Sequence, residues 1–108
     1  MTNNLTATLH TLNKTTQAHD LNLKLSQAIC DGDAVILIED GVYQCLAPFS
    51  AHNSTNDKPW PQLTKSIYAL KDDALTRGIP LTTDGITFVT YGEFVKLSLS
   101  HHKVVSWY

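Results

Sequence analysis

The feature that most constrains the fold is an unbroken run of five apolar residues, Ala-Val-Ile-Leu-Ile, at positions 34–38. A strand with one face in water alternates apolar and polar side chains, whereas a strand covered on both faces is apolar throughout. Cover on both faces is typical of a central strand in a parallel sheet. The run therefore predicts such a strand inside an α/β domain.

Strand and helix signals alternate along the rest of the chain. The expected strands are residues 5–12, 34–38, 66–70, 86–89 and 104–107. The expected helices are one that is capped by Thr15 or Thr16 and stops at residues 31–33, and those at 42–47, 71–77 and from Thr90 onward. Thr90 and Glu93 have the spacing of a capping box. Because parallel neighbours need a crossover, this order predicts a three-layer, flavodoxin-like α/β fold, with a mostly parallel five-stranded sheet and helices on both faces.

Functional side chains of such sheets gather beyond the carboxyl ends of the strands. Here the expected ends carry Asn13 and Lys14, then Glu39, Asp40 and Gly41, then Leu70 and Lys71, and finally Thr90 and Tyr91. Glu39 and Asp40 could bind a metal or act as an acid–base pair. Adjacent carboxylates at a strand end more often favour the positive N-terminus of the next helix.

Composition limits the classes of function. The chain has 108 residues, so we expect one domain at residues 9–108, preceded by a polar extension at residues 1–8. Its net charge is −2 and its eight Lys and Arg are scattered, whereas nucleic-acid binding needs a basic stripe. No apolar run approaches the ~20 residues of a membrane span, and residues 1–8 lack the pattern of a signal peptide. We therefore expect a cytoplasmic protein that binds neither nucleic acid nor a membrane by itself.

The two cysteines, Cys30 and Cys45, are weak candidates for catalysis. A nucleophilic thiol needs exposure and a nearby cation or helix N-terminus. Cys45 follows the acidic Glu39 and Asp40, whose charge disfavours a thiolate. Cys30 comes at the expected carboxyl end of the first helix, where the helix dipole opposes a thiolate. Both thiols are therefore expected to be structural.

The five histidines, His10, His19, His52, His101 and His102, show no metal-ligand spacing with the cysteines. Neither a metal nor another cofactor is therefore expected. His10 is expected to make a hydrogen bond in the core or at an interface, and the pair at 101–102 to be a solvated helix end.

Two features leave alternatives open. Residues 49–62 form the longest expected loop, whose role the sequence does not decide. Four aromatic side chains fit either core packing or anchoring at an interface, namely Tyr43, Tyr68, Trp107 and Tyr108.

Several short stretches occur in a fixed order from Leu9 to Trp107. They are residues 9–14 (LHTLNK), 37–43 (LIEDGVY), 67–70 (IYAL), 75–78 (LTRG), 91–95 (YGEFV) and 105–107 (VSW). Together they resemble the TusB/DsrH family of DsrE-like sulfur-relay proteins. The resemblance implies a DsrE-like fold and covers nearly the whole expected domain.

The resemblance also implies partners and a role. Such proteins assemble with TusC/DsrF-like and TusD/DsrE-like subunits, commonly as a dimer of heterotrimers. The Tus complex relays persulfide sulfur toward 2-thiouridine at the tRNA wobble position, and the main sulfur-carrying cysteine lies on the TusD/DsrE-type subunit. Some DsrH-type members carry a cysteine on the first helix, but residues 21–25 of this chain contain none. This difference favours a non-catalytic, structural subunit of the tRNA-thiolation type. The residues expected to serve fold and assembly are His10, Asn13, Lys14, Glu39, Asp40, Gly41, Tyr43 and Trp107.

Three alternatives remain at this point. The chain could be a DsrH-like subunit in sulfur oxidation, or a stand-alone persulfide carrier that uses Cys45. It could also be an unrelated flavodoxin-like module for a nucleotide or flavin, although Asn13-Lys14-Thr15-Thr16 stands where a Gly-rich phosphate loop would be needed. Self-association of the isolated chain also stays open.

Overall fold

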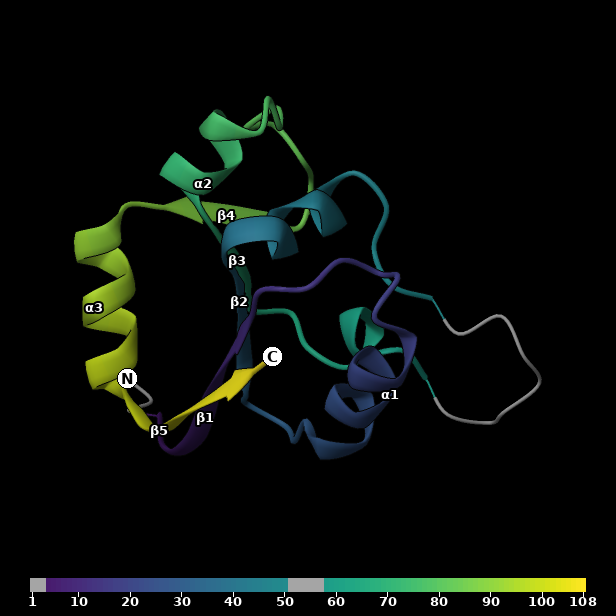
Figure 1. Ribbon diagram of the computed structural model, residues 1–108. Coiled ribbons are helices and arrows are strands. Elements are labelled where there is room, and N and C mark those ends of the chain that lie inside the picture. Colours follow the sequence, from purple (N-terminus) through teal and green to yellow (C-terminus); the bar gives the residue numbers. More distant parts are fainter. Residues whose placement is uncertain (1–3, 51–57) are drawn as a thin grey trace.

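Five strands, all parallel, form one sheet in the order β4-β3-β2-β1-β5 (Figure 1). The computed structural model describes residues 4–50 and 58–108. The strands are β1 Asn4–Leu12, β2 Ala34–Leu37, β3 Ile67–Leu70, β4 Ile86–Val89 and β5 His101–Trp107. All five predicted strands are present, and β2 is the central one.

Helices cover both faces of the sheet, but unequally (Figure 1). One face carries α1 His19–Ala28, the 3-10 segments η1 Glu39–Cys45 and η2 Trp60–Gln62, and α2 Lys71–Thr76. The other carries α3 Tyr91–Ser100. The chain adds β2, β3 and β4 beside β1 in turn and then returns to place β5 on the other side of β1. Because crossovers are right-handed, this reversal puts α3 on the opposite face. The predicted three-layer fold is confirmed.

The strand β2 is buried along its whole length. Val35 and Leu37 pack into the core beneath α1 and η1, whereas Ala34 and Ile36 pack into a second core beneath α3. Burying a large aliphatic side chain stabilises a fold by about 1.5–3 kcal/mol. The unbroken apolar run is thus explained, as predicted, by burial of both faces of a central strand.

The predicted start of the first helix is wrong. α1 begins at His19 after Ala18, and no side chain caps it. Thr15 instead closes a turn before the helix: its Oγ1 accepts a hydrogen bond from the N–H of Gln17, and its carbonyl accepts one from the N–H of Ala18. The turn uses the threonine hydroxyl locally, so the helix starts three residues later than Thr16.

Three further boundaries differ from the prediction. The helix expected at 42–47 is the 3-10 segment η1, which begins at Glu39 and ends at Cys45. The pair at 101–102 is not a solvated helix end, because α3 ends at Ser100 and His101 is the first, buried residue of β5. The chain therefore passes from helix to strand without a loop. At this junction Nδ1 of the His101 ring lies 2.7 Å from the Leu97 carbonyl oxygen, within hydrogen-bond distance. The first strand begins at Asn4, which pairs with His101, so β1 includes residues 4–8 of the expected extension.

The capping box of α3 is present. Thr90 Oγ1 accepts from the N–H of Glu93 at 3.2 Å, and a Glu93 carboxylate oxygen accepts from the N–H of Thr90 at 2.8 Å. These bonds lower the pKa of Glu93. Within the described residues, no helix has the length and apolar character needed to cross a bilayer.

Gly41 lies where η1 passes the end of β1. A Cβ atom built on this residue would overlap the carbonyl oxygen of Leu12, an atom that also accepts a hydrogen bond from the N–H of Ile38. The backbone of η1 therefore approaches β1 more closely than any residue with a side chain permits.

We expect Gly41→Ala to lower the free energy of unfolding by about 1–3 kcal/mol, the usual cost of overpacking. Gly92→Ala is the matched control, because its added Cβ would meet only Thr90 Oγ1 at 3.9 Å in a helix that favours alanine. Urea unfolding of the two variants measures the difference. Equal stability of the two would contradict the close approach.

Candidate functional site

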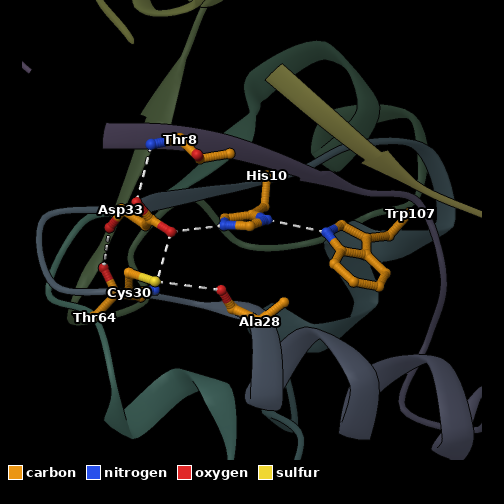
Figure 2. Close-up of polar contacts among 7 residues, drawn as sticks. All are labelled: Thr8, His10, Ala28, Cys30, Asp33, Thr64 and Trp107. Atoms are coloured by element: carbon orange, nitrogen blue, oxygen red, sulfur yellow. Dashed lines mark hydrogen bonds and ion pairs between the residues drawn. The ribbon is translucent and has the colours of Figure 1, made fainter. Parts of the chain in front are cut away.

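A chain of three side chains connects β5, β1 and the loop before β2 (Figure 2). Trp107 Nε1 donates to His10 Nδ1 at 3.0 Å, and His10 Nε2 lies 2.9 Å from Asp33 Oδ2. An indole nitrogen is only a donor, so His10 Nδ1 must be the acceptor and Nε2 carries the ring proton. His10 thus makes core hydrogen bonds, one of the two roles expected for it.

Asp33 is the residue on which this cluster converges. Its Oδ1 accepts from the N–H of Thr8 at 2.9 Å, its Oδ2 also accepts from the N–H of Cys30 at 3.0 Å, and its carbonyl accepts from Thr64 Oγ1 at 2.7 Å (Figure 2). Burial raises the pKa of Asp33, but hydrogen bonds from His10 and the two main-chain N–H groups outweigh it, and the net pKa is lowered. The carboxylate is therefore ionised at neutral pH.

The sequence analysis placed Asp33 at the end of the first helix and gave it no role in a site. The structure buries it to 4% exposure beside His10 at 3%. An acidic residue directly before a fully buried strand was the available signal, since such a residue needs partners at the sheet.

A cavity of about 380 Å³ lies beside this chain, between α1 and β5. Cys30, Lys103 and Trp107 are among the residues that line it. Cys30 is exposed, and its sulfur lies 3.6 Å from the Ala28 carbonyl.

Some of the residues predicted to lie beyond the carboxyl ends of the strands contact one another at this edge of the sheet, which we call the carboxyl edge. Asn13 Nδ2 donates to Glu39 Oε1 at 3.3 Å, the N–H of Glu39 donates to Asp73 Oδ2 at 2.7 Å, and Arg77 Nε donates to Asp40 Oδ1 at 3.0 Å. Glu39 has φ of +50°, a left-handed conformation that costs a non-glycine residue about 1–2 kcal/mol. These contacts tie η1 to α2, and neither acidic side chain caps η1.

Other predicted residues lie apart from these contacts. Lys14 is exposed and uses its carbonyl to accept from Gln44 Nε2 at 3.0 Å, and Tyr43 is 41% exposed. His52 lies outside the described residues. Among residues 4–50 and 58–108, no three His, Cys, Asp or Glu side chains are grouped to hold a metal ion.

A second buried network was missed by sequence reasoning. Asn22 Oδ1 accepts from Trp60 Nε1 at 3.1 Å and from Gln44 Nε2 at 3.0 Å. Asn22 is fully buried and Gln44 is 2% exposed. These polar residues sit at positions of α1 and η1 that carry no apolar signal, so the pattern could not identify them.

The two thiols differ in environment. Cys45 is 4% exposed within the core beneath α1. Burial raises the pKa of its thiol to about 11, against a smaller lowering by a main-chain hydrogen bond. Burial therefore keeps this thiol protonated, rather than the nearby acidic residues named in the sequence argument.

Cys45 should make the fold sensitive to alkali. Its folded pKa of about 11 lies above the ordinary 9.0, so the thiol ionises first in the unfolded chain. The contribution of the protonated thiol to the free energy of unfolding is fully present below pH 9. It is lost as the pH rises toward 11, by up to about 2 kcal/mol. We expect Cys45→Ala to show a smaller loss of unfolding free energy between these pH values, measured by urea titration. Parallel pH profiles for the two proteins would contradict this.

Comparison with known proteins agrees with this architecture. The profile of the family described as "DsrH like protein" matches residues 14–104. The ychN protein from E. coli has a solved structure that superposes with a TM-score of 0.60 over 94% of this chain and 97% of that chain. Its sequence identity is 16%, so this likeness concerns the fold alone.

Curated relatives are similar along almost their entire length. Protein TusB of Pectobacterium carotovorum subsp. carotovorum (strain PC1) is 31% identical over 100 residues, which is 92% of this chain and 99% of the relative. Protein TusB of Salmonella typhimurium has the same identity over the same share of each chain. The family profile and these relatives agree, and the chain belongs to the TusB/DsrH family.

Proposed function

We propose that this chain is a TusB-like subunit of a cytoplasmic sulfur-relay complex that serves 2-thiouridine formation at the tRNA wobble position. In this role it supports persulfide transfer without carrying the sulfur. Family membership across residues 14–104 and 31% identity to TusB proteins support the pathway. The burial of Cys45 is the observation that carries the non-carrier role.

The environment of each thiol supports this division of labour. A persulfide carrier has to meet its donor and acceptor at the surface as a thiolate. Cys45 is enclosed in the core and protonated at neutral pH. Cys30 is exposed, but it follows the carbonyl end of α1, which is the helix end that opposes negative charge.

The proposed partners are TusC/DsrF-like and TusD/DsrE-like subunits in a dimer of heterotrimers. The outer side of α3 supports such assembly, because no residue of α3 is buried. Tyr91, Val95 and Leu99 are 65%, 42% and 80% exposed. Their spacing of four residues places them in one stripe along the helix. We call these three residues the α3 stripe.

The sheet beneath α3 gives a physical reason for a partner there. Parallel sheets normally have both faces covered. In the described part of the chain, α3 is the one helix on its face. Val104 of β5, on the same face, is 42% exposed. A subunit seated against the α3 stripe would complete the cover.

The residues expected to serve assembly divide by exposure. His10 and Gly41 are buried and in this proposal serve the fold. Lys14, Glu39, Asp40 and Tyr43 are exposed at the carboxyl edge and remain proposed contacts. Asn13 and Trp107 are partly buried and belong to hydrogen-bonded clusters of the fold.

The non-carrier role predicts slow chemistry at Cys45. At neutral pH, iodoacetamide should label Cys45 of the native Cys30→Ala variant about 100-fold more slowly than in the unfolded chain, the ratio given by pKa values of about 11 and 9.0. Mass spectrometry after incubation with a persulfide donor should show no added sulfur atom on Cys45. A persulfide held by native Cys45, and lost in Cys45→Ser, would refute the role.

The assembly predicts co-purification with DsrE-like and DsrF-like proteins of the same organism. Val95→Glu with Leu99→Glu should weaken that complex at least about tenfold, because charge is costly in an interface core. Leu75→Glu is the matched control, since Leu75 is an exposed apolar residue of α2 at 55% exposure. Size-exclusion chromatography with light scattering reads the result. No complex with the unaltered chain, or equal loss in the Leu75 variant, would count against this surface.

A further inference from the structure

We propose that Trp107, His10 and Asp33 form a pH-sensitive latch, which holds the end of β5 against β1 while His10 is neutral and releases Trp107 when His10 is protonated. The inference concerns a conformational property of this chain and does not depend on the proposed function. It rests on the direction of the two hydrogen bonds that join these side chains (Figure 2). It rests as well on the unequal burial of the three residues.

The latch closes with one protonation state of His10. Its Nδ1 must offer a lone pair to the Trp107 N–H, 3.0 Å away. A proton that adds at Nδ1 places two N–H donors against each other, with no acceptor between them. The Trp107–His10 hydrogen bond is then lost, whereas the Nε2–H bond to Asp33 becomes an ion pair and strengthens.

The burial of the three side chains decides which end moves. Asp33 is fixed because each carboxylate oxygen accepts a main-chain N–H, one from Thr8 and one from Cys30. His10 is 3% exposed inside the sheet. Trp107 is only partly buried, at the last position of the edge strand β5. Protonation therefore moves the indole, and the adjoining cavity of about 380 Å³ gives it room.

The charges around His10 set the balance between the two states. Asp33 favours the imidazolium. Lys103 and His102 of β5 line the same cavity and oppose it, while Cys30 is the remaining titratable group there. From α1 the lining residue is Ala28, which has no charge. Protonation of the imidazole is the charge change that breaks the Trp107–His10 bond, so acidification is the signal that opens the latch.

The two tryptophans allow a direct test by NMR of uniformly 15N-labelled protein. The Trp60 N–H donates to Asn22, which does not titrate, and Trp60 is 1% exposed. Between pH 8 and 5 the Trp107 N–H signal should shift, and its hydrogen exchange relative to Trp60 should rise about tenfold on loss of one hydrogen bond. Long-range 15N spectra should show His10 as the Nε2–H form at high pH. Far-UV circular dichroism checks that the fold persists.

His10→Gln is the decisive variant, because a glutamine amide offers an acceptor to Trp107 and a donor to Asp33 and has no proton equilibrium in this range. The Trp107 signal should then be independent of pH. In Trp107→Phe, which removes the bond that favours neutral His10, the ring 15N signals of His10 should report protonation at a less acidic pH than in the wild-type protein. The latch is refuted if Trp107 responds equally in His10→Gln. It is refuted as well if folded wild-type protein protonates His10 without any change at Trp107.

Discussion

The parallel sheet is stable only when both of its faces are shielded from water, and the rest of this structure follows from how that cover is provided. β2 lies at the centre and is buried on both sides. Four helical segments shield one face, whereas α3 alone shields the other in the described part of the chain. The exposed α3 stripe is a direct consequence, since one helix cannot bury its own outer side. A protein with this imbalance is suited to contact another subunit.

Buried polar side chains on the sheet face that carries α1, η1, η2 and α2 hold the loops between the strands and helices in place. Asp33 joins β1, the loop after α1 and the segment before β3 through hydrogen bonds to Thr8, Cys30 and Thr64. Asn22 joins α1 to η1 and η2 through Gln44 and Trp60. A buried polar group without partners is costly, so each network accepts few substitutions. The connections are therefore fixed although several of their helices are short.

The same packing makes Cys45 a poor candidate for a sulfur carrier. Cys45 fills part of the main core, and burial raises the pKa of its thiol to about 11. A site that stabilises the fold by excluding water cannot also present a thiolate to a donor. In the role that we propose for a TusB-like subunit, the exposed side chains on α3 and at the carboxyl edge contact the partner subunits.

The sequence alone determined the succession of strands and helices along the chain, the two-sided burial of β2 and the capping box of α3. These features depend on residues close together in the chain, whose spacing records periodicity and local hydrogen bonds. It also indicated the family, because short stretches along nearly the whole chain resemble it. Tertiary structure alone decided the pairing of His10 with Asp33 and Trp107, which are 23 and 97 residues away. It likewise decided the burial of Asn22 and Gln44 and the place of His101 at the start of β5. Such partners are chosen by strand register and by the handedness of the crossovers, and neither is encoded in the spacing of neighbouring residues.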